Sequence, residues 1–388
     1  MRSRTQRRMA GLAVLGGSLL GSLGLWAQDI PLDPRNSVKI NLPQDSPVTL
    51  LSMTMGESRA TARGAALVLD LHMSLTLRNA SSNRIHGVTL RVVSQEVAVG
   101  GKASVAVPSL NVGPGEAFPL RIDLQLMRPT QVAGGPLVQV DLDGVLFQDL
   151  SFYGPDRLHS RRTLTAWEME AQRDREHFKR VLAQSGPEGL RQEMLASLTR
   201  EADRPRLDVR VVRHRAVGTL AAGLAERTAQ FAFLNFPDAP VQPVEGWAEV
   251  LGNEARSPRI EVKNRSPRAV KYVELGWLVT DSKGQQYMAA SLPASDPDLF
   301  LPPGKTARVL QDTELRFTRD GEPVNVQKMT GFVSQVEFAD GKIWVPNRQN
   351  LERSALLPVV VPSAEEQRLT ELYSRKGLQA LIQELKKY

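Results

Sequence analysis

Three aspartates lie close together around an Asp-Gly pair in the first half of the sequence and are the best candidates for a metal site. Asp141, Asp143 and Asp149 fall in the stretch DLDGVLFQD, and carboxylate oxygens at short spacing are the ligands that calcium prefers. A second Asp-Gly, in FADGKIW, has only Glu337 and Asp340 near it. Because a calcium loop needs six or more oxygens at fixed positions, we expect no calcium at either place.

Asp-Gly between two apolar segments is instead typical of a tight β-hairpin. A type I′ turn requires positive φ at both central residues, and Asp-Gly adopts it readily. The pairs stand at 143–144 and 340–341. We therefore predict the same hairpin at both places. The aromatic residue that follows each pair, Phe147 or Trp344, is expected to be buried in the core of a β-sheet unit.

The histidines offer a second kind of chemistry. His72, His86 and Asp123 would together provide zinc ligands or an acid–base pair. His72, however, alternates with polar residues along an expected strand, and Lys271 occupies the place of His86 in the second half of the sequence. His177 lies in the charged stretch DREHFKR, within 156–180, and we expect this range to form the solvated face of a helix. We therefore predict no catalytic, cofactor-binding or metal-binding residues.

Two further features point to a ligand rather than to catalysis. The stretch RPRLDVRVVRHR, from Arg204 to Arg215, is either a phosphate-binding strand or an edge strand whose charges keep it from pairing with other chains. We favour the edge strand. Trp247, Trp277 or Trp344, if exposed, would provide a platform on which a sugar ring stacks.

The N-terminal residues and the composition indicate export. Residues 2–8 carry four arginines and no acid, an uncharged and mostly apolar run follows from Met9 to Trp26, and Ala27 precedes a polar pair. This is the layout of a secretory signal peptide over 1–27, with an uncleaved membrane anchor as the alternative. The chain has no cysteine, which favours a bacterial periplasm or cell surface over a disulfide-bonded eukaryotic protein.

Charge and motifs exclude several classes of protein. Removal of 1–27 takes away four arginines and no acid, so the net charge falls from +7 to +3, which gives no electrostatic footprint for nucleic acid. The absence of cysteine excludes thiolate zinc sites and cysteine nucleophiles. Neither an HExxH motif nor a glycine-rich phosphate loop follows residue 27. A binding or structural protein is therefore expected.

Similar segments recur in the same order in the two halves of the chain. Asn79 and Asn264 each begin an Asn-x-Ser motif. In a bacterial protein this motif predicts a turn and not a glycosylation site. Five pairs match at offsets of 185 to 197 residues: NLPQDSPV with NFPDAPV, LTLRNASSNRIHGVTLRVV with IEVKNRSPRAVKYVELGWLV, GPGE with PPGK, the two Asp-Gly pairs, and GLRQEML with GLQALIQ. Ordered self-similarity predicts a tandem duplication, in which 207–233 has no counterpart.

Each copy is expected to be a β-sandwich followed by a short pair of helices, so that the fold class is mainly β. Period-two alternation in 37–150 and 207–347, with regular turn signals, is typical of an immunoglobulin-like sandwich. Helical periodicity and the capping boxes SGPE and SAEE predict a helical hairpin over 156–203 and helices over 363–388. We expect the C-terminal helices to pack on the sandwich of their own copy, or otherwise on a partner protein.

The segment 264–345, with Asn-x-Ser, DSKG and LPPG between its strands, resembles small immunoglobulin-like domains of exported bacterial proteins, including FxLYD domains; 79–150 resembles them more loosely. The resemblance implies extracytoplasmic binding or spacer modules. We therefore predict an exported, non-enzymatic scaffold that binds another envelope or extracellular protein, without nucleic acid or a cofactor, and that meets the membrane only through an uncleaved N-terminal segment. The alternatives are a module that binds carbohydrate or an envelope polymer, and an enzyme with an unrecognised carboxylate site.

Overall fold

The computed structural model describes residues 29–33, 35–130, 135–213, 226–293, 298–310 and 313–388. In these ranges the protein is mainly β, as predicted, with several sheets and three helices. The predicted signal peptide, 1–27, lies outside the described residues. None of the three helices is long and apolar enough to cross a membrane.

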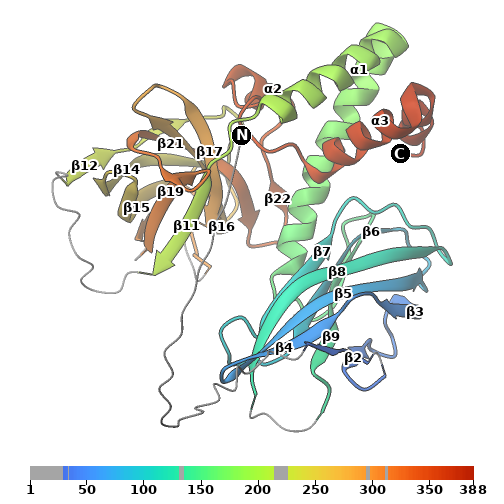
Figure 1. Cartoon of the computed structure of the whole chain (residues 1–388). Helices are drawn as coiled ribbons and strands as arrows, with labels where there is room; N and C mark the ends of the chain where they lie inside the picture. The colour runs from blue at the N-terminus through green and yellow to red at the C-terminus, as the bar shows by residue number, and fades with distance from the viewer. Residues whose placement is uncertain (1–28, 34, 131–134, 214–225, 294–297, 311–312) are drawn as a thin grey trace, which may run out of the picture.

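The first β unit, 29–153, consists of two sheets that share one hydrophobic core (Figure 1). One sheet has the order β1-β4-β5-β3, with β8 also paired to β5, and the other has the order β10-β9-β6-β7, with β2 parallel to β9. The strands are β1 (Asp29–Pro31), β2 (Val38–Asn41), β3 (Val48–Met55), β4 (Arg59–Arg63), β5 (Ala66–Asn79), β6 (Ile85–Val93), β7 (Lys102–Val107), β8 (Ala117–Pro129), β9 (Val138–Phe147) and β10 (Phe152–Tyr153).

The second β unit, 208–344, is also built from two sheets around one core. Their orders are β11-β19-β15-β14-β12, with β18 on β15 and β20 on β19, and β13-β21-β16-β17, with β22 on β21. The strands are β11 (Asp208–Arg213), β12 (Arg227–Gln230), β13 (Ala232–Leu234), β14 (Val241–Leu251), β15 (Glu254–Asn264), β16 (Val270–Asp281), β17 (Gln286–Pro293), β18 (Thr306–Leu310), β19 (Thr313–Arg319), β20 (Glu322–Pro323), β21 (Val326–Phe338) and β22 (Ile343–Trp344).

Strand pairings in the two units correspond. The ladder β7-β6-β9-β2, whose last pair is parallel, has the same arrangement as β17-β16-β21-β13. The short strand β1 on β4 has its counterpart in β12 on β14. The expectation that 207–233 has no equivalent is therefore wrong for its second half, which supplies β12 and β13. Within that segment only β11 is an addition to the shared arrangement.

The Asn-x-Ser turns are the same in atomic detail. Asn79 and Asn264 are both completely buried. Each amide nitrogen donates to two backbone carbonyls, 2.8 and 3.0 Å away for Asn79 and 2.7 and 2.9 Å away for Asn264. Each side-chain oxygen accepts from the backbone of the serine two residues on, Ser81 or Ser266, at 2.9 Å. The predicted turn role of both asparagines is confirmed. Their buried side-chain amides bind backbone groups that have no strand partner once the strand ends.

The two Asp-Gly pairs, in contrast, are not equivalent. Asp143 lies inside β9, whereas Asp340 lies in the turn between β21 and β22. In that turn Gly341 has a φ of 80° while Asp340 is not in the positive-φ region, so the hairpin is a three-residue loop ending in a left-handed residue, not a type I′ turn. Asp149 is the true counterpart of Asp340: each carboxylate accepts from the backbone two residues on.

The aromatic prediction needs the same correction. Phe147 pairs with Ile85 on β6 and is buried, and its counterpart is Phe338, which pairs with Val270 on β16. Trp344 is only partly buried. Its counterpart is Tyr153 on β10. The hydroxyl of Tyr153 donates to Asp45 in the loop before β3, and the indole N–H of Trp344 donates to Asp238 in the equivalent loop before β14.

Three helices follow the β units. They are α1 (Ser160–Asp203), α2 (Arg348–Arg353) and α3 (Ala364–Leu385). Gly186 in α1 and Gly377 in α3 have φ values of 67° and 79° and divide each long helix into two segments. The predicted helical pairs are thus present, and Ser363 caps α3 by accepting from the backbone N–H of Glu366 at 3.0 Å. The internal repeat aligns Gly186, and not Gly189, with Gly377.

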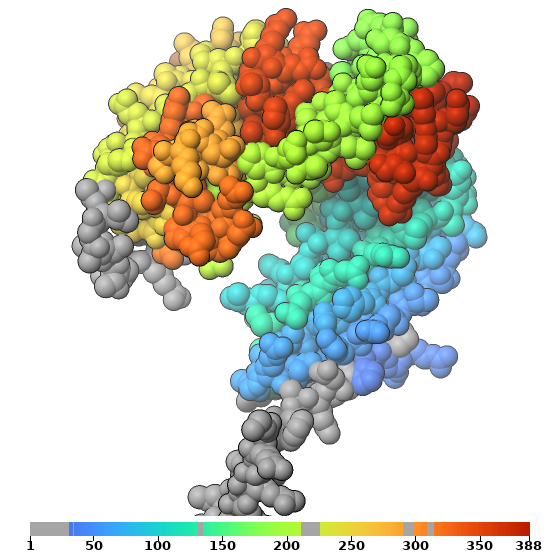
Figure 2. Space-filling view, turned by 45° about the horizontal axis from the view of Figure 1, so that its top comes forward, coloured from blue at the N-terminus to red at the C-terminus, as the bar shows by residue number. Residues whose placement is uncertain are grey.

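The expected packing of the C-terminal helices on their own sandwich is wrong. In Figures 1 and 2, α3 lies against α1, which follows the first β unit. Their shared core consists of Phe178, Leu190, Met194, Leu369, Leu381, Ile382 and Leu385. Phe178 and Leu369, Leu190 and Leu381, and Met194 and Leu385 are pairs of residues 191 apart. The apolar stripe of one helical pair therefore packs against the equivalent stripe of the other, so that both stripes are removed from water.

Candidate functional site

The helical junction, formed by α1, α2 and α3, joins the two β units and contains many charged side chains. Its first anchor is Asp143, which is 1% exposed. This carboxylate accepts from the backbone of Arg157 at 3.0 Å and of Leu158 at 3.1 Å, and from the hydroxyl of Ser160. Because these groups lie immediately before and at the first residue of α1, Asp143 fixes the start of the helix on β9.

The first half of α1 then packs on the first β unit. A Cβ added at Gly87 on β6 would lie only 2.9 Å from the side chain of Leu164, so the glycine allows the helix to lie close to the sheet. Next to it, His86 Nδ1 lies 3.0 Å from Glu168 Oε1, and both side chains are at most 3% exposed. Arg175 donates to the same carboxylate oxygen.

The same helix is bound to the second β unit by ion pairs. Arg162 donates to Glu337 on β21 and, at 2.8 and 2.9 Å, to both oxygens of Asp298. Its guanidinium lies 3.8 Å from the centre of the Tyr272 ring on β16. Arg161 donates to Glu337 at 3.0 Å. Since α1 is fixed on one side to β6 and β9 and on the other to β16 and β21, it sets the relative position of the two units.

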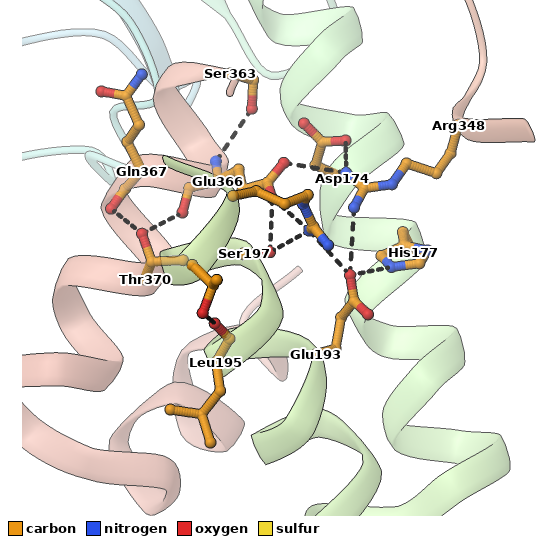
Figure 3. Close-up of polar contacts among 12 residues, drawn as sticks. Asp174, His177, Glu193, Leu195, Ser197, Arg348, Ser363, Glu366, Gln367 and Thr370 are labelled. Carbon is orange, nitrogen blue, oxygen red and sulfur yellow. Dashed lines mark hydrogen bonds and ion pairs between the residues drawn. The ribbon is translucent and has the colours of Figure 1, made fainter. Parts of the chain in front are cut away.

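A network of buried charges closes the junction around α2 and α3 (Figure 3). Arg348, 6% exposed, donates to Glu366 at 3.0 Å and to Glu193 at 3.3 Å, and lies 3.5 Å from Asp174. Glu366 also accepts from the hydroxyl of Ser197 at 2.7 Å. Each buried charge thus has an opposite charge or a hydrogen-bond donor beside it, which is the condition under which such groups are tolerated.

The pKa values of these carboxyl groups differ with their surroundings. Desolvation opposes ionisation of Glu193, but the hydrogen bond from His177 and the charge of Arg200 prevail and lower its pKa to about 2. Desolvation, with Asp174 and Glu274 nearby, raises the pKa of Glu170 to about 7, although Arg173 acts in the other direction. Within one helix, therefore, one glutamate stays ionised and another exchanges its proton near neutral pH.

The prediction that this part of α1 is a solvated charged face is wrong. Arg162, Glu168, Asp174 and Arg175 are all buried. Their partners lie in β6, β21, α2 and α3, far away in the sequence, so charge composition alone did not reveal them. His177 is 14% exposed and lies 3.3 Å from Glu193. The only sequence signal was the mixture of acids and bases around an apolar stripe.

A groove of about 370 Å³ runs along the junction between α1 and residues 345–349. Its basic side chains are Arg173, His177, Arg180 and Arg348, and its one acidic side chain is Glu176. Arg173 bridges the two walls, donating to Asp174 at 2.9 Å and to the carbonyl of Pro346 at 3.2 Å. Arg180 is exposed and forms no ion pair with any residue that the structure describes.

The aspartates considered for calcium serve three separate purposes. Asp141 lies 3.3 Å from the guanidinium of Arg91, Asp143 anchors α1, and Asp149 accepts from Ser151. In the second unit, Glu337 pairs with α1 and Asp340 accepts from the turn backbone. Among the described residues, no cluster of three or more histidine, aspartate or glutamate side chains is arranged to hold a metal.

The histidines considered for zinc lie on different sheets. His72, on β5, is exposed and lies 3.0 Å from Asp123 on β8; this hydrogen bond raises the pKa of the imidazole. His86, on β6, is buried against α1 instead. The expected solvent-facing position of His72 is confirmed, whereas the burial of His86 beside Glu168 was not foreseen.

The remaining candidates are also located. β11, which covers 208–213 of the arginine-rich stretch, is an edge strand paired only with β19 among the described strands, as predicted; His214 and Arg215 lie outside the described residues. Trp277 is 4% exposed and belongs to the core. Trp247 is partly exposed and lines a cavity of about 480 Å³ with Arg259, whose guanidinium lies 4.5 Å from the centre of the Trp247 ring.

Comparisons with known proteins add no family. No protein-family model and no curated protein match the chain. A red sea bream transglutaminase is similar at 8% identity and a TM-score of 0.12 over 75% of this chain and 31% of that one. A structure titled pT26-6p has 8% identity and a TM-score of 0.16 over 86% and 73%. A β-glucosidase from Kluyveromyces marxianus has 9% identity and a TM-score of 0.14 over 68% and 45%.

Proposed function

We propose that the protein is an exported, non-enzymatic scaffold that holds two immunoglobulin-like, FxLYD-like domains in a fixed orientation and binds another protein of a bacterial envelope or cell surface. The observation that carries this proposal is the double anchoring of α1. One helix contacts β6 of the first unit through Leu164 and Glu168 and contacts β9 through Ser160. It contacts the second unit through Arg162.

The energetics of the junction support a role in positioning. Buried ion pairs contribute little net stability, because desolvation offsets their attraction, but an unpaired buried charge is costly. Any change in the angle between the β units separates Arg162 from Glu337 or Glu168 from His86. The network therefore disfavours other orientations far more than it stabilises the native one, which is a property a scaffold needs.

Duplication of one domain is supported by the matching strand orders and by the same buried hydrogen bonds at Asn79 and Asn264. A duplicated domain offers two similar surfaces, and these are held at one spacing by α1. In the view of Figure 2 the second unit lies to the left of the helices and the first unit lies below them. Such an arrangement suits a partner that contacts both units.

The groove along the junction gives the first contact surface to test. Its other basic side chains, Arg173, His177 and Arg348, already lie against acidic residues of the junction, whereas Arg180 is exposed there without an ion pair among the described residues. Charge complementarity therefore favours an acidic segment of the partner protein. A rim charge of this kind mainly increases the rate of association and its dependence on salt.

Site-specific crosslinking tests this function. A photoreactive amino acid is placed at position 180 of the full chain in its native host, and at the exposed position 376 on α3 as the control. We expect one discrete crosslinked protein from position 180, lost when the neighbouring His177 is replaced by glutamate, and none from position 376. The same products from both positions, or none from position 180, would contradict the proposal that the groove binds a protein.

Carbohydrate binding is the second candidate, because Trp247 is partly exposed beside a cavity that also contains Glu245, Glu261 and Arg308. The stacked guanidinium of Arg259 already occupies one face of the ring, so a sugar would have to use the other face or displace it. Affinity electrophoresis in envelope polysaccharides separates the two candidates. Retardation that disappears in Trp247→Ala would favour carbohydrate binding over the scaffold role.

A further inference from the structure

The strand β3 lies at the edge of one sheet of the first β unit. It pairs with β5 alone among the described strands, so the backbone groups along its other edge have no strand partner in the part of the chain that the structure describes. Figure 1 shows β3 on the side of the first unit that faces away from the second unit. An unpaired strand edge is a template on which another strand can add.

The side chains of β3 give little protection against such an addition. The strand reads VTLLSMTM, from Val48 to Met55, and contains neither a charged residue nor a proline. Leu50 and Leu51 are 36% and 44% exposed. Natural edge strands are protected by charges, by prolines or by bulges. β3 has only a bulge, because Leu51 is an extra residue in the ladder between Leu50 and Ser52.

The equivalent edge in the second β unit is better protected. β14 occupies the same place beside β15, and its ladder is also interrupted by an extra residue, Val244, which is 52% exposed. On either side of this residue lie Pro243, which has no N–H to donate, and Glu245, which is charged and exposed. The two units thus share the bulge, but only the second has the proline and the charge that prevent pairing.

We propose that β3 pairs with β3 of a second copy of this chain, so that the sheets of two first units join across a two-fold axis. Two copies of one strand related in this way run antiparallel and use the same surface on both subunits. A charged strand would place like charges opposite one another, which is destabilising. Because β3 contains no charge, its own copy fits beside it without repulsion, and the contact removes Leu50 and Leu51 from water.

This contact is separate from the protein-binding groove, which is lined by α1 and residues 345–349. Sedimentation velocity on the full chain over a range of concentrations tests it, and we expect a monomer–dimer equilibrium. Leu51→Lys should weaken dimerisation at least about tenfold, because each subunit loses an apolar side chain from the contact and the two lysines repel. Val244→Lys makes the matched change at the bulge of β14 and should dimerise as the native protein does. Both positions are exposed, so both variants should fold.

Single cysteines test the antiparallel arrangement, because the native chain contains none. Two copies of a residue separate by about 7 Å for each position away from the two-fold axis, and a disulfide needs Cα atoms within about 7 Å of each other. Leu51→Cys or Ser52→Cys, at the centre of β3, should therefore form disulfide-linked dimers on oxidation. Val244→Cys is the control and should remain monomeric under the same conditions.

A monomer at every concentration, or a dimer that persists in Leu51→Lys, would overturn the proposal. Disulfide formation at position 244 as efficient as at 51 and 52 would also do so, because random collision would then explain all three. A third outcome concerns a different occupant. If a photoreactive amino acid at the exposed position 49 links to another protein in the native host, and not to a second copy, β3 receives a partner strand and self-pairing is refuted.

Discussion

Replacing Glu366 by alanine measures how far the buried charges hold α3 in place. The carboxylate accepts from Ser197 at 2.7 Å and from Arg348 at 3.0 Å, and Arg200 is 3.2 Å away. Without this carboxylate, the guanidinium of Arg348, which is 6% exposed, keeps only the more distant Asp174 and Glu193 as acidic neighbours. Removing one partner of a buried ion pair costs about 3–5 kcal/mol. We expect a loss near 3 kcal/mol, because Arg348 keeps its contact with Glu193.

The matched control is Glu371→Ala on the same helix. Glu371 pairs with Arg375 at 2.7 Å, but the two side chains are 58% and 76% exposed. An exposed pair of this spacing contributes about 0.3–0.5 kcal/mol, so the control should change stability very little. Both substitutions exchange glutamate for alanine within a helix, so the intrinsic helix propensity cancels in the comparison.

Urea unfolding followed by tryptophan fluorescence gives both free energies of unfolding. Equal losses in Glu366→Ala and Glu371→Ala would refute the reasoning, because burial would then add nothing to the cost. A double substitution adds a second check. Arg348→Met combined with Glu366→Met removes both charges, so it should recover part of the loss seen in Glu366→Ala alone.

Three further predictions concern other parts of the fold. Glu170→Gln should remove a pH dependence of the free energy of unfolding. Because the folded-state pKa of Glu170 is raised to about 7 from 4.5, the stability from this group is complete below about pH 4.5 and declines by at most about 3 kcal/mol as the pH rises through 7. Identical pH profiles of stability in the native and variant proteins would contradict this. Asn264→Ala should cost about 2–4 kcal/mol, because two buried carbonyls lose their donor, whereas a melting temperature unchanged within a degree would speak against it. Asp143→Ala should speed hydrogen exchange at residues 157–160 and leave exchange in β21 unchanged; equal effects in both regions would indicate global loss of stability instead.

Local sequence patterns determined the elements of this protein and the internal similarity between its halves. The alternation of apolar residues predicted the strands, and Asn-x-Ser predicted the turns at Asn79 and Asn264, because a side-chain amide bonding two residues along the chain needs only local geometry. The cap of α3 at Ser363 was predicted for the same reason. The Asp-Gly pairs show the limit of such patterns: one forms a turn, whereas Asp143 lies within a strand and binds the start of α1.

Only the tertiary structure decided what covers each apolar stripe and which charges are paired. Helical periodicity shows that Leu381 and Leu385 lie on one face, but the burial of an apolar face is non-directional, so it did not distinguish a sandwich from α1. Charge composition likewise suggested solvent around Asp174, whose partner Arg348 is 174 residues away in the sequence. His86 and Glu168 meet because β6 packs against α1. Sequence thus fixed the faces, and the close packing of distant elements fixed their partners.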